Sequence, residues 1–510
     1  MGEFSQYIKH ELDANEAKAI EMNAYAIGVS PDVLMENAGS ALAREAKERF
    51  PKKRRILVVC GSGNNAGDGF AAARILSKNK EVYVAMLFGK NNVKPGPSSK
   101  NLDRLVRSNV TITLVGNSAQ KLKAQLSQSD LVLDCILGMG SHGEPKGTVA
   151  NAIHAINASG KPVISADIPS GINTATGSCK HAVNADCTVT FHRAKSFMDA
   201  SRRAGKIVVA DIGIPERAEL FAGPGDIYLA STPRDAKSDK RTNGRVLVIG
   251  GSKDFHGAPA LAYSASYAML AALRSGAGYV SAFVPESAVL ANRRVSPNVI
   301  VRAFSGDALS ERDVEPISKA VAHFDSVVIG PGLGRDEESL SAANNIIRAT
   351  QKLGKSLVID ADAITAIKSQ RLKGTAVITP NRREFEPVWG SLPRSTQGIA
   401  KRVLQAAQGT GACVLLKGHT TIVSDGHAIK MIQSGSAALG TMGTGDVLSG
   451  MIAGFAAENH NIFRSAIAGA YLHSAIGDTL HRKIGDRILA TDVIKNIPHM
   501  ADALMKFRAR

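Results

Sequence analysis

Short apolar runs alternate with helix-like segments along almost the whole chain, and polar or glycine-rich loops follow many of the runs. The clearest case is Arg55–Cys60 (RILVVC), which leads into the loop GSGNNAGDG and then into the helix-like segment FAAARILSK. Strands that alternate with helices in this way form a parallel sheet that is covered by helices. The pattern therefore predicts an α/β fold whose ligands bind at the carboxyl ends of the strands.

The alternation occurs in two series. A segment that mixes proline, glycine and charge, 214–243, separates them as linkers do. Because 510 residues are too many for one typical domain, we expect two domains joined by a linker. We assign residues 1–220 to a Rossmann-like domain with a doubly wound sheet, 221–240 to the linker and 241–510 to a second α/β domain. The predicted strands are 55–60, 82–88, 110–115, 131–137, 162–168, 186–191 and 206–212, and then 245–250, 279–284, 298–304, 326–330, 356–360, 375–379, 412–417, 420–424 and 428–432.

Composition and charge narrow the class of protein. No apolar run is long enough to span a membrane, and the N-terminus has no signal-peptide pattern, so we expect a cytoplasmic protein with no membrane partner. The net charge of +17 favours anionic partners. Since the basic residues are scattered and no RNA-binding signature is present, we expect a small anionic ligand and no nucleic acid.

The segment Gly443–Asp446 (GTGD) is the strongest candidate for a catalytic loop in the second half. It precedes VLSGMIAGFAA, which has the composition of an apolar helix. Backbone N–H groups at a helix N-terminus, together with the helix dipole, favour an anion such as phosphate. Asp446 would then take a proton from a substrate hydroxyl while the amides hold the developing charge. In the alternative interpretation, Asp446 only caps the helix and the glycines form a turn.

Four further loops follow predicted strands of the second half. Gly330–Gly334 (GPGLG) is a loop that can approach a ligand closely. Asp360 and Asp362 either bind substrate or a hydrated Mg²⁺, or merely cap the next helix. The segment 379–385 forms a polar cluster. Lys417 could pair with a nucleotide phosphate, although a lone lysine in a turn is more often simply exposed.

The first glycine-rich loop is not a dinucleotide fingerprint of the hydride-transferring kind. Gly61–Ala66 satisfies the GxGxxG/A spacing, but the next strand ends in Phe88-Gly89-Lys90 without the acid that would hold a ribose. The loop nevertheless offers oxygen atoms that suit a ribose, an amide or a monovalent cation. Polar side chains at two neighbouring strand ends should converge on it, namely Asp134, Asp167 and Ser170. For the loop alone, a simple Asn-rich turn remains the alternative.

These motifs resemble two enzyme families joined in one chain. Through LMENAG, GSGNNAGDG, LDCILGMG and ADIPSGIN, the first half resembles NAD(P)H-hydrate epimerases. Through GGSKDFHGAPALA, RSGAGYV, GPGLG, IDADA, LLKGHTT and GTGDVLSGMIAG, the second half resembles ADP-dependent NAD(P)H-hydrate dehydratases of the ribokinase-like superfamily. Both sets in this order point to the bifunctional NAD(P)H-hydrate repair enzymes.

The resemblance implies a two-step repair. The first domain would interconvert the R and S epimers of hydrated NADH or NADPH. The second would transfer phosphate from ADP to the hydroxyl of the S hydrate, after which phosphate leaves and NAD(P)H and AMP remain. It also implies K⁺ in the epimerase domain and Mg²⁺ in the dehydratase domain, and we expect a homo-oligomer.

The resemblance also assigns residues. In the epimerase domain, Asp167 would be the acid–base group, with Lys195 as a secondary neighbour. The K⁺ ligands would be Asn65, Asp134 and Ser170. The substrate would be lined by Asp167 and by Asn64, Asn65, Ala66, Gly67, Asp68, Gly138, Met139, Gly140, Ser141, His142, Gly143 and Glu144. In the dehydratase domain, the hydrate would contact Ala258, Gly334, Asn381 and the base Asp446. The nucleotide would contact Lys417, Gly418, His419, Thr420, Thr421 and Gly445.

The sequence departs from the family pattern at two positions. Ala66 replaces the first glycine of the Asn-Asn-Gly-Gly-Asp loop, which would strain the loop if that position needs a positive φ. Asn381 replaces a histidine expected near the substrate, and an amide cannot carry a proton at neutral pH. A kinase of a small alcohol with an N-terminal ligand-binding module is the alternative function, because GTGD also fits ribokinase-like kinases.

Overall fold

The computed structural model describes residues 4, 7–141, 143–178, 180–198, 202–232, 234–252, 264–367 and 370–507. The chain forms two compact units, one made of Met1–Ile8 with Glu216–Arg508 and the other of Lys9–Pro215. The chain therefore passes between the units twice, at residues 8–9 and again at 215–216. Ile8 is buried in a hydrophobic core of the larger unit, which explains why the first residues belong there.

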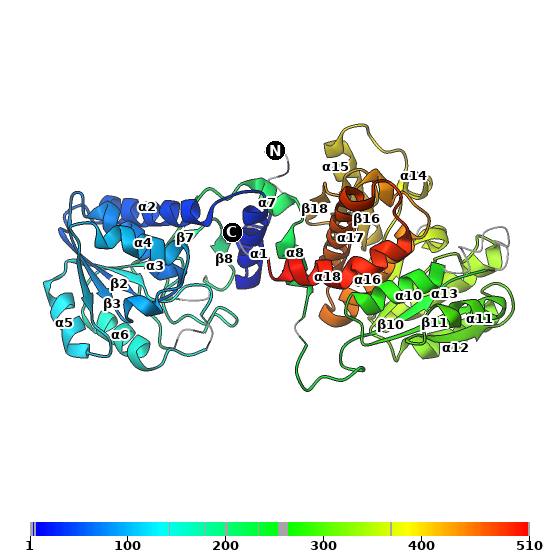
Figure 1. Ribbon diagram of the computed structural model, residues 1–510, viewed down its shortest axis with the longest axis horizontal. Helices are drawn as coiled ribbons and strands as arrows, with labels where there is room; N and C mark the ends of the chain where they lie inside the picture. Colours follow the sequence, from blue (N-terminus) through cyan, green and yellow to red (C-terminus); the bar gives the residue numbers. More distant parts are fainter. Residues whose placement is uncertain are drawn as a thin grey trace. The chain divides into compact units, whose positions relative to one another are not determined.

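The smaller unit is built on a seven-stranded parallel sheet in the order β4-β3-β2-β5-β6-β7-β9 (Figure 1). The connections run one way from β2 to β4 and the other way from β5 onward, so the order reverses between β2 and β5. Such a reversal opens a crevice at the carboxyl ends of the two strands. The strands are β2 (Arg55–Cys60), β3 (Glu81–Met86), β4 (Thr111–Leu114), β5 (Leu131–Cys135), β6 (Val163–Ala166), β7 (Cys187–Phe191) and β9 (Lys206–Ala210).

Helices cover both faces of this sheet. One core joins alternate strand residues to α2, α3 and α4, and a second core joins the intervening residues to α5 and α6. Just before α1, the short strand β1 (Glu11–Leu12) pairs in parallel with β8 (Ala194–Lys195). The helices are α1 (Ala14–Ala26), α2 (Pro31–Arg49), α3 (Asn64–Leu76), α4 (Pro97–Val106), α5 (Ala119–Gln128) and α6 (Gly147–Ala158).

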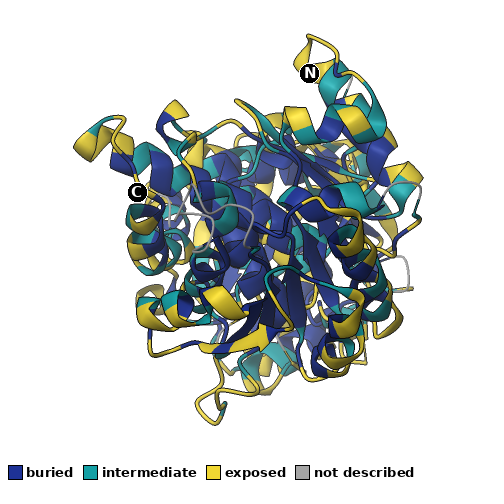
Figure 2. Ribbon diagram, turned by 90° about the vertical axis from the view of Figure 1, so that its right-hand side faces the viewer, coloured by how far each residue is buried: buried dark blue, intermediate teal, exposed yellow. Residues whose placement is uncertain are grey.

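The larger unit has a nine-stranded sheet in the order β12-β11-β10-β13-β14-β15-β16-β17-β18. Its pairs are parallel up to β16, and β17 and β18 then return as an antiparallel hairpin. Most strand residues are buried (Figure 2). The strands are β10 (Arg245–Ile249), β11 (Tyr279–Pro285), β12 (Ile300–Phe304), β13 (Ser326–Ile329), β14 (Ser356–Ile359), β15 (Ala376–Ile378), β16 (Cys413–Leu416), β17 (Thr421–Ser424) and β18 (Ile429–Ile432).

The helices of the larger unit also pack on both faces of its sheet. One core contains α12, α13 and α15, and the other contains α10, α16 and α17. None of the described helices is long and apolar enough to cross a membrane. The helices are α7 (Glu216–Leu220), α8 (Pro224–Ala230), α10 (Ser264–Arg274), α11 (Glu286–Val295), α12 (Glu311–Val321), α13 (Glu337–Lys352), α14 (Arg382–Trp389), α15 (Thr396–Thr410), α16 (Thr444–Asn459), α17 (Ile462–Ile484) and α18 (Ala490–Met505).

The predicted fold class, two α/β domains with mainly parallel sheets, is confirmed. The predicted linker needs a correction, because 221–240 contains the buried helix α8. Pro224 occupies the first turn of α8, where proline does not interrupt helical hydrogen bonds, and Ile227 and Ala230 pack in one core with residues of α16, α17 and α18. The units divide at 215–216 rather than at 220. The functional limits 1–220 and 241–510 stay predictions.

If α8 is part of the domain core, Ile227→Ala will lower the free energy of unfolding of the larger unit by about 3 kcal/mol, since it opens a cavity at a fully buried site. Urea unfolding followed by circular dichroism measures the change. Leu290→Ala on α11 removes the same number of carbons from a side chain that is 61% exposed, and should change stability by less than about 0.5 kcal/mol. Equally small changes in the free energy of unfolding for both substitutions would support the prediction that 221–240 is a linker.

Candidate active sites

The first candidate site lies at the carboxyl ends of β5 and β6 in the smaller unit. Asp134, in β5, is fully buried and accepts hydrogen bonds from Ser170 Oγ (2.6 Å), Ser170 N (2.8 Å) and Ser165 Oγ (2.8 Å). Burial raises the pKa of Asp134, although these hydrogen bonds oppose the rise. The structure thus brings Asp134 and Ser170 together, as the strand ends predicted.

Asn65 completes a set of oxygen atoms at this site. Its Nδ2 donates to the Leu137 carbonyl (2.9 Å), while Leu137 N donates to Ser170 Oγ (2.8 Å). Asn65 Oδ1 is buried and receives no hydrogen bond within the described part of the chain. Leaving a buried carbonyl oxygen unpaired costs free energy. A cation that prefers oxygen ligands would satisfy it, so the donor set of Asn65, Asp134 and Ser170 fits K⁺. No cluster of three or more His, Cys, Asp or Glu suited to a metal occurs among the described residues.

Asp167 follows β6 and lies beside Lys195. Its φ is +61°, a left-handed conformation that is uncommon for residues other than glycine and costs backbone energy. Lys195 Nζ lies 3.2 Å from Asp167 Oδ1 and also donates to Thr190 Oγ1 (2.9 Å). The lysine side chain is only 3% exposed, so it is held firmly. Lys195 is therefore the ion-pair partner of Asp167.

Glu21 and Tyr25 on α1 also belong to this site, and no sequence motif indicated them. The Tyr25 side chain hydrogen-bonds Glu21, and Glu21 interacts electrostatically with Asp167 and Lys195. Burial and the Asp167 charge raise the pKa of Glu21 to about 7. Burial, Asp167 and Glu21 also raise the pKa of Asp68 well above its ordinary value. Only the pairing of β1 with β8, which carries Lys195, would have pointed to α1.

The remaining residues predicted for the first site occupy α3 and the loop between β5 and α6. Ala66 is fully buried in the first turn of α3 with a right-handed conformation, so the strain considered for a positive φ does not arise. His142 lies outside the described residues. The described remainder is Asn64, Gly67, Asp68 in α3 and Gly138, Met139, Gly140, Ser141, Gly143, Glu144 in the loop.

The second candidate site surrounds the N-terminus of α16 in the larger unit. Gly443 is the N-cap residue with φ of +87°, and a Cβ there would lie 2.7 Å from the Tyr267 ring, so glycine is required. Thr444 Oγ1 donates to the Leu439 and Thr441 carbonyls, which fixes the preceding turn. The N-cap is Gly443, and Asp446 is the third residue of the helix. The alternative in which Asp446 caps the helix is therefore wrong.

Lys417 faces this helix terminus and is held by a buried carboxylate. Its Nζ lies 2.9 Å from Asp360 Oδ1 and 3.7 Å from the position that a Cβ on Gly445 would occupy. Ser449, one turn along α16 from Gly445, donates to the other Asp360 oxygen. Burial opposes ionisation of Asp360, but Lys417 and these hydrogen bonds keep its pKa below the ordinary value. Asp360 therefore ties the lysine to α16.

The same charges act on Asp446. Burial and the Asp360 charge raise the pKa of Asp446 from 3.8 to about 7, against a hydrogen bond with Ser264 and the Lys417 charge. A carboxylate with such a pKa is suited to accept a proton near neutral pH. The structure thus joins Asp446, Gly445 and Lys417, as predicted.

Two neighbouring loops were predicted only in general terms. Asp362 accepts hydrogen bonds from Arg335 Nε (2.7 Å) and Gly334 N (3.1 Å), so it holds the GPGLG loop in place. Asn381 caps α14: its Oδ1 accepts from Glu384 N (3.1 Å), and Glu384 Oε2 accepts from Asn381 N (2.8 Å). Glu384 Oε2 lies 3.9 Å from Lys417 Nζ, which links this cap to the site.

The other predicted contacts of the second site lie in the turn between β16 and β17. Gly418 and His419 are exposed there, and Thr420 and Thr421 are partly exposed, as a site open to a ligand requires. Ala258 lies outside the described residues.

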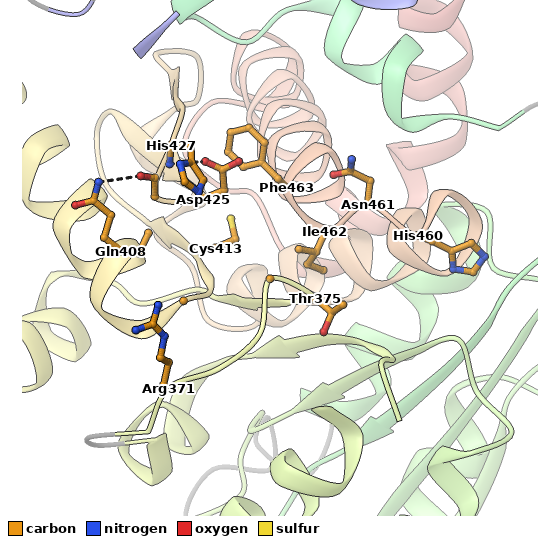
Figure 3. A pocket seen from close by; sticks show the side chains of 14 residues that line it. Arg371, Thr375, Gln408, Cys413, Asp425, His427, His460, Asn461, Ile462 and Phe463 are labelled. Atoms are coloured by element: carbon orange, nitrogen blue, oxygen red, sulfur yellow. Dashed lines mark hydrogen bonds between the residues drawn. The ribbon is translucent and has the colours of Figure 1, made fainter. Parts of the chain in front are cut away.

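A cavity of about 730 Å³ lies at the opposite end of β16 (Figure 3). It is lined by Cys413 at the start of that strand, whereas Lys417 follows its end. Arg371, Asp425, His427 and His460 also line it, and none of the predicted site residues does. The C-termini of α15 and α16 and the N-terminus of α17 meet there, and the lining side chains carry charges of both signs. The cavity therefore shows no clear preference for one class of ligand.

Comparison with known proteins matches both halves of the chain. Residues 31–197 match the family model of the YjeF-related protein N-terminus, and residues 246–499 match that of NAD(P)H-hydrate dehydratase. The bifunctional NAD(P)H-hydrate repair enzyme Nnr of Pyrobaculum aerophilum is 36% identical over 95% of this chain and 97% of its own length. That of Archaeoglobus fulgidus is 34% identical over 96% and 97%. A solved ribokinase-like superfamily protein from Enterococcus faecalis covers 56% of this chain and 96% of its own, with 25% identity and a TM-score of 0.49.

The raised pKa of Asp446 makes stability depend on pH. Below pH 3.8 the carboxyl is neutral in both the folded and unfolded states, whereas above pH 7 the folded state bears an unfavourable charge. Asp446→Asn should therefore raise the free energy of unfolding by about 2 kcal/mol at pH 8, a value reduced for partial exposure, and the gain should vanish as pH falls from 7 toward 4. Urea unfolding at pH 4, 6 and 8 checks this. A gain that does not vary with pH would contradict the raised pKa.

Proposed function

The chain belongs to the family of bifunctional NAD(P)H-hydrate repair enzymes, and we propose that it epimerises hydrated NADH and NADPH and dehydrates the S epimer at the expense of ADP. The observation that carries the proposal is that each half brings acid–base carboxylates to the carboxyl ends of its strands, beside oxygen ligands suited to a cation in the smaller unit and beside a lysine and a helix N-terminus in the larger one. The relatives that match nearly the whole chain bear the names of this two-step repair.

Dehydration belongs to the site at α16. With its pKa near 7, Asp446 accepts the proton of the substrate hydroxyl as that oxygen attacks the terminal phosphate of ADP. The N–H groups at the start of α16 stabilise the charge on the phosphoryl group in transfer. The phosphorylated hydroxyl is then a good leaving group, and its departure as phosphate, with loss of a proton from the adjacent ring carbon to solvent, restores NAD(P)H. The hydrate contacts Asp446, Gly334, Asn381 and, by family resemblance, Ala258.

The nucleotide lies against Lys417 and the following turn. The Lys417 ammonium, fixed by Asp360, meets phosphate oxygens, while Gly445 leaves room for the phosphate to approach the backbone. Bound Mg²⁺ would supply further charge neutralisation for the phosphates. The proposed nucleotide contacts are Lys417, Gly418, His419, Thr420, Thr421 and Gly445.

Epimerisation belongs to the site at β5 and β6. The unpaired Asn65 Oδ1, with Asp134 and Ser170, supports a K⁺ ion that would orient the substrate by charge. Asp167, which Lys195 holds in place, exchanges protons with the hydrate. The substrate lies along the start of α3 and the loop 138–144. A cytoplasmic location and a homo-oligomeric state stay predictions.

A repair assay on the full-length chain tests the function. Mixed R and S NADH hydrate is incubated with Mg²⁺, K⁺ and either ADP or ATP, and recovery of the dihydronicotinamide absorbance is followed. We expect recovery of both epimers, faster than they interconvert spontaneously. Recovery of the S portion alone would remove the epimerase half of the proposal. A stable phosphorylated product without recovery would favour a kinase of a small alcohol.

Asp446→Asn should lower the rate of dehydration at least 100-fold and leave conversion of R to S unchanged, because the base is lost only from the larger unit. The two rates are measured separately by chromatography of the epimers. Equal loss of both activities would contradict the assignment of Asp446 to one site.

Asp167→Asn should have the reverse effect. The S epimer should be repaired at the wild-type rate, while use of the R epimer slows to its spontaneous conversion. Unchanged epimerisation in this variant would remove Asp167 from the mechanism.

A further inference from the structure

We propose that Glu21 is a second catalytic residue of the epimerisation site, which exchanges a proton with the substrate hydroxyl while Asp167 serves the other face of the ring. The inference rests on the proposed function and names a residue that neither the sequence motifs nor the family comparison assigned.

Backbone pairing fixes α1 beside the site. Leu12 of β1 pairs with Lys195 of β8, and Ser196 N donates to the Leu12 carbonyl (3.1 Å). Asp13 then starts α1 with a capping box, accepting from Glu16 N (2.8 Å). The strand that delivers Lys195 to Asp167 is thus the one that holds the helix carrying Glu21. Main-chain hydrogen bonds therefore fix the start of α1 beside the lysine that pairs with Asp167.

Charged groups from several elements face Glu21. Asp167 follows β6, and Lys195 belongs to β8. Asp68 lies in α3, and Lys94 lies in the loop before α4, where its N–H donates to the Ser62 carbonyl. Tyr25, one turn along α1, hydrogen-bonds the Glu21 carboxyl. Asp167 has Lys195 at 3.2 Å, whereas Glu21 has no ion pair of that kind among the described residues. Asp167 is thus paired with a cation, whereas Glu21, with a pKa of about 7, keeps a protonated fraction at neutral pH.

Epimerisation at a hydroxyl-bearing carbon needs one group that donates a proton and one group that accepts a proton. The C–O bond on one face breaks as the Glu21 proton passes to the hydroxyl, and water leaves a planar cation. A second water adds to the opposite face, forming the new C–O bond, and gives its proton to Asp167. The proton returns to Glu21 through solvent, and the reverse direction exchanges the two roles. Two carboxyls supply the proton on one face and accept the proton on the other without either having to reach both faces.

The pH dependence follows from the same pair. Because the pKa of Glu21 is about 7, its protonated fraction, and with it the rate, should fall as pH rises above 7. Burial and the Asp167 charge raise that pKa, while the Lys195 and Lys94 charges and the Tyr25 hydrogen bond lower it. Tyr25→Phe removes one of the lowering influences, so it should move the alkaline limb of the rate profile to higher pH.

The test measures conversion of purified R NADH hydrate to S by full-length variants with K⁺ present, from pH 5.5 to 9. Glu21→Gln should lower kcat at least 100-fold with KM changed less than threefold, and should abolish the alkaline limb. Glu21→Asp should recover part of the rate. Glu48→Gln, the same change at an exposed position on α2, is the matched control and should behave as wild type.

The outcomes separate this inference from the proposed function. If wild type does not convert R to S, the epimerase assignment itself fails. If wild type converts R and Glu21→Gln keeps its kcat and its alkaline limb, Glu21 has no catalytic part. If Glu21→Gln does not fold, Tyr25→Phe decides, and an unmoved alkaline limb in that variant overturns the proposal.

Discussion

The buried ion pair between Asp360 and Lys417 is the interaction on which the larger site depends. An isolated carboxylate buried at the end of β14 would be costly, so the lysine that follows β16 is required there. Once paired, the carboxylate also receives Ser449, which binds the first turns of α16 to two strand ends. This one contact fixes the start of α16 and the position of the ammonium, whereas the raised pKa of Asp446 comes first from its burial and then from the Asp360 charge.

The smaller unit also contains a lysine paired with an aspartate at a strand end. Lys195 is buried and pairs with Asp167, while a second carboxylate, Glu21, has no such ion pair among the described residues and has a pKa of about 7. In the larger unit the paired aspartate is Asp360, and the proposed base is Asp446. In the smaller unit the paired Asp167 is itself the proposed acid–base group. Each unit thus places a carboxylate that is paired with a lysine near a second carboxylate whose pKa is about 7.

Most of the fold was predictable because strand ends in parallel sheets converge by geometry. Asp134, Ser170 and Lys417 could be placed from their positions after apolar runs alone. Glu21 could not be placed, since it precedes every strand of the main sheet and reaches the site only through a two-residue pairing. The helix α8 was missed because its proline and glycines mark a turn by composition, while its burial depends on distant helices. The fit of Ala66 in α3 likewise required its backbone angles.

The cap that Asn381 forms on α14 shows a similar limit. From the sequence, the replacement of a histidine suggested an altered contact with substrate, and the observed hydrogen bonds are those of a helix start. The same residue pair leaves Glu384 within 3.9 Å of Lys417. A substitution that looks like a change in chemistry can therefore preserve a local structure on which the chemistry rests.

The double passage of the chain between its units has a consequence for the history of the gene. Ile8 is buried in the core of the unit whose other residues begin at Glu216, so the two folding units are interleaved in sequence. Splitting the gene at codon 216 would remove that residue from the larger unit and leave an apolar tail on the smaller one. Fission into two independent genes would require a compensating change in that core, which gives the fused arrangement a physical barrier against separation.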